Sequence, residues 1–157
     1  MYPELQTLIH EAEYNYLQKD DLELFSEHIN NLQQKLEVYR LLRDQEIEIF
    51  QGVADKLVAQ FSDSQEKALE TSLHHWLLIM RYAAMAMLLN NPEFLERRLL
   101  EWLTDIVQVR ESQSIDSAVH SLLMTQLGKT MDSSELNYLE PFLNQAKEYL
   151  VNAPVRA

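Results

Sequence analysis

Glycine and proline are scarce in this chain, and their scarcity constrains the fold more than any other feature of the sequence. The 157 residues include two glycines and four prolines, which leaves little material for the tight turns that join strands. Leucine, glutamate, glutamine, alanine and methionine are abundant, and all of them favour helix. The sequence therefore predicts an all-α fold, and its length fits one domain over residues 1–157.

Apolar residues recur at steps of three and four along most of the chain, which is typical of helices that bury one face. The second helical stretch is too long for one ordinary globular helix, so breaks are expected near Asn30–Asn31 and near Gln45. Gly52 is either a further break or a point of close packing. The predicted helices cover residues 4–18, 21–61, 64–89, 92–107, 114–127 and 132–150.

Capping signals mark several of the expected helix ends. Ser62-Asp63-Ser64 precedes Glu66, and Asp132 precedes Glu135, in each case offering side-chain oxygens to free backbone N–H groups. Asn91-Pro92 places proline at the first position of a helix, where its missing donor costs nothing. Gly128 is expected to cap the C-terminus of the helix before it.

The composition excludes several classes of function. Without cysteine the chain forms no disulfide, no thiolate metal site and no thioether to a cofactor. A net charge of -12 opposes binding to nucleic acid. The longest apolar run, residues 76–89, contains Arg81 and is shorter than the roughly 20 residues of a membrane-spanning helix. With no signal peptide visible, we expect a cytoplasmic protein.

His74 and His75 are the most conspicuous polar pair on an expected helix. Adjacent residues point about 100° apart, so the two imidazoles cannot bind one metal from the same face, and we expect one to face the core and the other solvent. The chain lacks the paired Glu-x-x-His units of a di-iron bundle and carries no catalytic motif. We therefore expect neither a metal site nor an enzyme. The methionines at 80, 85, 87 and 124 are interpreted as core filling.

A family resemblance extends over nearly the whole chain. Tyr16-Leu17, the leucine-rich residues 36–42 and Ala54-Asp55-Lys56-Leu57 can be aligned with the start of a phycobiliprotein subunit. Arg81 and the run Ala-Met-Ala-Met-Leu-Leu-Asn-Asn at 84–91 resemble the helix that carries the pigment in that family. The resemblance implies a globin-like fold, with an N-terminal helical hairpin over residues 4–30 and a core over residues 31–150.

The departures from the family pattern bear on function. The position of the thioether cysteine is at or next to Ser72, and the following Arg-Asp pair, whose aspartate holds the pigment nitrogens, aligns near His74-His75. A serine forms no ordinary thioether, and a histidine does not supply the acceptor charge of the aspartate. The resemblance thus implies a degenerate attachment position and no covalently bound bilin.

Three hypotheses about function follow. The leading one is a bilin-less protein that acts by binding other proteins, as an accessory or assembly factor of the cyanobacterial photosynthetic apparatus. It would pair through residues 4–30 with a second copy or a related subunit, and would bind phycobilisome proteins or proteins of the thylakoid membrane from its periphery. The second is a non-covalent carrier of a bilin, haem or chlorophyll, with His74, His75 and Arg81 as candidate contacts. The third is an unrelated dimeric helical bundle.

Overall fold

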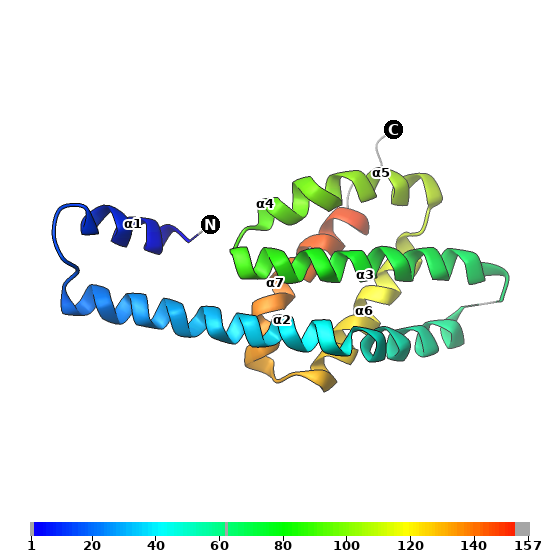
Figure 1. Cartoon of the computed structure of the whole chain (residues 1–157). Coiled ribbons are helices and arrows are strands. Elements are labelled where there is room, and N and C mark those ends of the chain that lie inside the picture. The colour runs from blue at the N-terminus through cyan, green and yellow to red at the C-terminus, as the bar shows by residue number, and fades with distance from the viewer. Residues whose placement is uncertain (1, 62, 153–157) are drawn as a thin grey trace.

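The predicted all-α fold is confirmed by the computed structural model, which describes residues 2–61 and 63–152 and contains no strand in those ranges (Figure 1). The helices are α1 (Pro3–Ala12), α2 (Lys19–Gln60), α3 (Glu66–Leu89), α4 (Pro92–Leu95), α5 (Glu101–Arg110), α6 (Gln113–Thr130) and α7 (Ser133–Leu150). A 3₁₀ turn (Asp63–Gln65) precedes α3, and one π-helical turn (Glu96–Leu100) joins α4 to α5.

Helix α2 runs unbroken for 42 residues, so the predicted breaks near Asn30–Asn31 and Gln45 are wrong. Asparagine and glutamine cost a helix interior well under about 1 kcal/mol each, and neither removes a backbone donor. Sharp kinks need proline, a glycine or serine site, or an inserted group. The only glycine in α2, Gly52, does not break the helix. A Cβ at this position would lie 2.7 Å from the Gln126 side chain of α6. Gly52 is therefore the point of close packing.

The first helix is shorter than predicted and ends at Ala12 instead of residue 18. Residues 13–18 form the turn that leads into α2. Helix α2 begins at Lys19, two residues before the predicted start, with a capping box in which the Gln18 backbone N–H donates to Asp21 Oδ2 at 3.1 Å. The predicted helix was too long because Tyr16 was counted as part of its apolar face. The Tyr16 side chain is exposed and belongs to no buried face.

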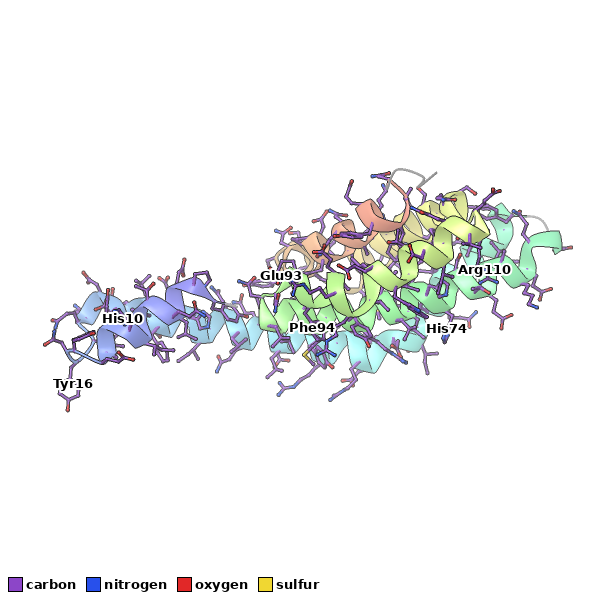
Figure 2. All side chains as sticks on the ribbon, turned by 90° about the horizontal axis from the view of Figure 1, so that it is seen from above. His10, Tyr16, His74, Glu93, Phe94 and Arg110 are labelled. Atoms are coloured by element: carbon purple, nitrogen blue, oxygen red, sulfur yellow. The ribbon has the colours of Figure 1, made fainter. Side chains whose placement is uncertain are left out.

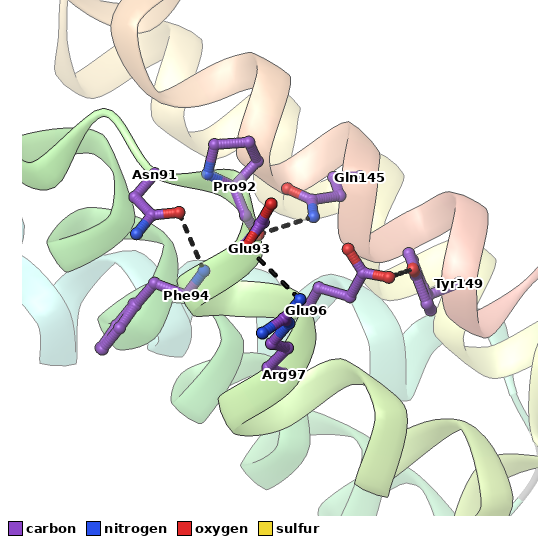
Figure 3. A network of polar contacts seen from close by, with 8 residues as sticks. All are labelled: Asn91, Pro92, Glu93, Phe94, Glu96, Arg97, Gln145 and Tyr149. Carbon is purple, nitrogen blue, oxygen red and sulfur yellow. Dashed lines mark hydrogen bonds and ion pairs between the residues drawn. The ribbon is translucent and has the colours of Figure 1, made fainter. Parts of the chain in front are cut away.

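The predicted helix start at Asn91-Pro92 is confirmed, and this helix and the π-helical turn after it contact α7 (Figure 3). Asn90 takes the left-handed conformation that ends α3, and Asn91 Oδ1 accepts from the Phe94 N–H at 3.3 Å. Gln145 Nε2 donates to the Pro92 carbonyl at 3.0 Å, and Tyr149 donates to the Glu96 carboxylate. These contacts hold α4 and the π-helical turn against the last helix.

The other three capping predictions have different outcomes. Asp132 and Glu135 form the expected reciprocal box at the start of α7. Helix α3 begins at Glu66 after the 3₁₀ turn, and Ser62 lies outside the described residues. Gly128 is not a cap, because α6 continues through it to Thr130. The physical reason is that residue 128 needs no left-handed backbone, so nothing requires glycine at this position.

Replacing Gly128 with alanine is expected to raise the free energy of unfolding by about 0.5–1 kcal/mol. Alanine restricts the unfolded chain more than glycine does and suits a helix interior. A Cβ at residue 128 meets no atom within 4 Å. Urea denaturation checks the prediction, and a loss of stability would show that the backbone at this position is strained.

The core lies between the second half of α2 and helices α3, α5, α6 and α7. Its largest buried side chains include Trp76, Ile79, Met80 and Met87, all from α3. Buried residues in α2 begin at Val38. As expected, the methionines at 80 and 87 fill the core, and those at 85 and 124 are partly buried.

Helix α1 and the first half of α2 extend together beyond the other helices (Figures 1 and 2). We call residues 3–36 the N-terminal arm. Tyr2, just before the arm, contacts the core: its hydroxyl donates to the Leu88 carbonyl at 2.6 Å. Lys35 Nζ donates to the same hydroxyl at 3.3 Å. No described helix combines the length and hydrophobicity needed to cross a membrane.

Candidate functional site

The candidate site residues all lie on α3, but they divide between two sides of it. Ser72 and His75 line a cavity between α3 and the turn that joins α5 to α6. His74 and Arg81 line a groove between α2 and α3. The division follows from helix geometry, because residues 74 and 75 point about 100° apart. As expected for this pair, His74 is exposed and His75 is partly buried.

The inner cavity is small. Its volume is about 160 Å³, and its lining includes Arg110, Ser112 and Ile115 beside Ser72 and His75. Pockets that hold drug-sized ligands measure roughly 300–1,000 Å³. Ser72 itself is 2% exposed. The cavity can therefore hold a few atoms, but not a pigment of four pyrrole rings.

A buried carboxyl group is hydrogen-bonded to two residues that line this cavity, Ser72 and Ser112. Asp116 of α6 is fully buried, and its Oδ1 accepts from the Trp76 indole N–H at 3.1 Å. The Ser112 hydroxyl donates to Oδ2 at 2.9 Å, and Ser72 is a third hydrogen-bond partner of the carboxyl group. A buried polar group is tolerable when it is hydrogen-bonded in this way. We call Ser72, Trp76, Ser112 and Asp116 the Asp116 cluster.

Burial shifts the protonation of the groups around this cluster. It raises the pKa of Asp116, although hydrogen bonds from Ser112, Trp76 and Ser72 act against the shift. It lowers the pKa of His75, against the attraction of the Asp116 charge. Desolvation also lowers the pKa of His120. The ring of His120 packs edge-on to Trp76 at a centroid distance of 5.5 Å, and its Nε2 lies 3.2 Å from Asn144 Oδ1.

The outer groove is larger, more open and mostly apolar. Its volume is about 550 Å³, and its apolar lining includes Phe50, Leu73 and Leu77. Arg81 forms a bidentate ion pair with Glu46 of α2, with Nε to Oε1 at 2.6 Å and Nη2 to Oε2 at 2.9 Å. This pair lies between the groove and a second hollow of about 300 Å³. Arg81 thus joins α2 to α3 in the structure.

Sequence reasoning missed Asp116, Ser112 and Trp76 as site residues. One signal for Asp116 is present, because an acidic residue falls on the apolar stripe of α6. Its partners come from two helices, so spacing along the chain does not connect them. Among the described residues, no three histidine, aspartate or glutamate side chains gather as metal ligands would.

Comparison with known protein families decides the relationship of the chain. The model of a family described as phycobilisome protein matches residues 8–150. The chain belongs to the phycobilisome protein family. Its fold is therefore the all-α, globin-like phycobiliprotein fold, and the alternative of an unrelated helical bundle is excluded. A search of curated proteins finds no match. Family membership suggests a phycobiliprotein-like role in light harvesting, and phycobiliproteins assemble into oligomers.

The residues at the family's attachment position do not fit a covalently held bilin. The chain has no cysteine, Ser72 is buried, and the cavity beside it is too small. The carboxyl group hydrogen-bonded to Ser72, that of Asp116, already has further hydrogen-bond partners inside the protein. The residue at the attachment position, Ser72, therefore lacks the thiol that covalent attachment of a bilin requires.

The lowered pKa values of His75 on α3 and His120 on α6 predict a loss of stability in mild acid. A folded-state pKa below the unfolded value, near 6.5, gives stability that is present above that pH and lost as the pH falls through the folded pKa. The raised pKa of Asp116 acts in the opposite direction, since its contribution is present in acid and lost as the pH rises through the folded pKa.

Replacing His120 with glutamine should flatten the dependence of stability on pH below about 6.5, because the amide removes the titrating group. The groups that act on His120 are Asn144, Lys147 and Glu140 of α7. Urea denaturation of both proteins across this range checks the prediction. Equal losses in the two proteins would show that His120 contributes nothing to the acid response.

Proposed function

We propose that this chain is a pigment-free, non-enzymatic member of the phycobilisome protein family that acts by binding other proteins. It serves as an accessory or assembly factor of the cyanobacterial photosynthetic apparatus, associated with phycobilisomes or with photosystem assembly at the periphery of the thylakoid membrane. It pairs with a second copy or a related subunit through residues 4–30.

The observation that carries this proposal is an unpartnered apolar face on the N-terminal arm. The face consists of Leu22, Phe25, Ile29, Leu32 and Leu36 of α2, and we call it the arm stripe. Its side chains are 36% to 54% exposed. The spacing of three and four residues is that of a helix packing against a partner. A contiguous apolar face of this kind marks a protein interface.

The exposed face continues along α2 to the outer groove. At 100° per residue, positions 22, 29, 36 and 47 fall within about 40° of one another on a straight helix. Ile47 is 82% exposed and lines the groove with Phe50. The chain therefore offers an apolar ridge and an apolar groove on one side. Pairing of two subunits that places the ridge of each in the groove of the other would cover both.

The experiment is a measurement of association with defined partners. The purified chain, alone and mixed with isolated phycobiliprotein subunits, is analysed by sedimentation equilibrium and native mass spectrometry. Affinity capture from cyanobacterial extract then tests for phycobilisome or photosystem subunits. We expect a dimer or a heterodimer and one of these complexes in the eluate. A monomer at every concentration, with neither complex retained, would refute the proposal.

A non-covalent tetrapyrrole carrier is the second candidate, favoured by one observation. His74 and Arg81 line the same groove, whose volume falls in the range of small-molecule sites. An exposed imidazole over an apolar floor is a competent axial ligand for a metal tetrapyrrole. Against this function, the Arg81 guanidinium is already paired with Glu46, so a carboxylate of the ligand would have to displace that partner.

Titration with haem, chlorophyllide and biliverdin tests the carrier function. Binding through His74 should shift the absorption spectrum of the ligand, and His74→Ala should remove the shift while His75→Ala keeps it. The His75 variant is the matched control, since His75 faces the inner cavity instead of the groove. No spectral shift at micromolar ligand would sink this candidate.

A further inference from the structure

We infer that the Asp116 cluster, which includes Trp76, closes the family's pigment site from within. Restoring cysteine at position 72 then does not by itself restore attachment of a bilin. The inference deepens the proposed pigment-free function and rests on it. It assigns the loss of pigment to the packing of α3 against α6, and not only to the missing sulfur.

Position 72 is enclosed by its neighbours. The side chain is 2% exposed and is hydrogen-bonded to Asp116, which is fully buried. A cysteine placed there keeps the same direction, with its sulfur toward the carboxyl group and the Ser112 hydroxyl. A thiol is a weak hydrogen-bond donor and fits such a buried position without reaching solvent.

Trp76 fills buried space next to Ser72 on the inner side of α3. It lies four residues after Ser72, one helical turn along the same face of α3. Its side chain is 0% exposed. The indole N–H donates to Asp116 on α6, and the ring packs against His120 one turn further along that helix. The indole is therefore held at its polar and its apolar edge, between α3 and α6.

The cavity that remains is on the outer side of this cluster. Its volume, about 160 Å³, is roughly half the lower limit for sites that take drug-sized ligands. Removing the indole would open buried space around residue 76, next to Ser72, which lines the existing cavity. Trp76 is thus the large side chain that occupies the buried space next to position 72.

The first test measures the reactivity of a thiol at position 72. The chain has no cysteine of its own, so Ser72→Cys introduces a unique thiol that Ellman's reagent reports. His74→Cys is the matched control, because residue 74 lies on the exposed side of the same helix. We expect the control thiol to react at the rate of an unfolded peptide and the Ser72→Cys thiol to react at least 100-fold more slowly. Equal rates in two folded variants would overturn the inference.

The second test offers the pigment itself. Phycocyanobilin and a bilin lyase are supplied to Ser72→Cys, to Ser72→Cys/Trp76→Leu and to a phycobiliprotein subunit with its own cysteine. Attachment adds the S–H across a carbon–carbon double bond of the bilin: the S–C bond forms, the proton passes to the neighbouring carbon, and no oxidant is needed. Covalent pigment is read as zinc fluorescence on a denaturing gel.

We expect Ser72→Cys to stay colourless, and the double variant to carry pigment and to react faster with Ellman's reagent. Loading of Ser72→Cys to the level of the control subunit overturns the inference, as does a double variant as protected as the single one. Circular dichroism confirms folding. If either cysteine variant unfolds, non-covalent phycocyanobilin binding to Trp76→Leu but not to wild type supports the inference, and equal binding refutes it.

These outcomes separate the inference from the proposed function. Pigment on Ser72→Cys alone refutes the role of Trp76 but leaves the wild-type chain without an attachment residue. Pigment on the wild-type chain refutes the pigment-free function itself.

Discussion

Replacing Trp76 with alanine is expected to lower the free energy of unfolding by about 3–5 kcal/mol, the usual cost of removing a large aromatic side chain from a core. The side chain is fully buried and contacts both α6 partners described above. Asp116 also loses one hydrogen-bond donor, and a buried acceptor left unpaired adds to the loss. No single substitution elsewhere in the site removes as much packing.

Trp102 provides the control for this measurement. The chain has two tryptophans, and Trp102 on α5 is 59% exposed. Trp102→Ala should change stability by no more than about 0.5 kcal/mol. Guanidinium denaturation followed by circular dichroism gives both values. A Trp76→Ala protein as stable as Trp102→Ala would show that the space around residue 76 is not tightly packed.

Replacing Ile29 with glutamate is expected to weaken subunit pairing by at least about 100-fold. Burying an isoleucine side chain is worth about 1.5–3 kcal/mol, and a charge in its place must be desolvated without a partner. In a symmetric dimer the change occurs twice. A loss of about 2.7 kcal/mol already corresponds to 100-fold in Kd. Ile29 is the middle residue of the arm stripe, so its removal interrupts the surface at its centre.

Asn30→Glu is the matched control, because it adds the same charge at the next residue, about 100° away from the stripe. Asn30 is exposed in the structure. Sedimentation velocity over a range of concentrations should show that the control variant pairs like wild type. Equal weakening by both substitutions would mean that net charge, and not the arm stripe, governs association.

The helical content and two of the helix starts could be predicted because they depend on residues close together in the sequence. The scarcity of glycine and proline predicted an all-helical chain, and Asn91-Pro92 and the Asp132–Glu135 pair predicted two helix starts. The breaks proposed within α2 were wrong because its apolar face drifts from the core to the arm, which a continuous helix allows. Gly128 was misassigned because a glycine near the end of a pattern resembles a cap even where the helix continues.

The site was predicted only in part, since it depends on which helices pack together. Ser72 was singled out through the family pattern, but its burial is a property of the tertiary structure. The predicted grouping of His74, His75 and Arg81 separates into two faces of α3. Asp116 is far from Trp76 in sequence, and only the packing of α6 on α3 brings them together.

One measurement joins the two properties proposed for this chain, absence of pigment and binding of a partner. The wild-type chain is produced in a cyanobacterial host that makes bilins and their lyases. It is then analysed by size-exclusion chromatography with light scattering and a full absorption spectrum across the peak. The expected result is a complex of two chains, or of one chain with a related subunit, in which this chain carries no visible absorption of its own. A coloured monomer would contradict both properties.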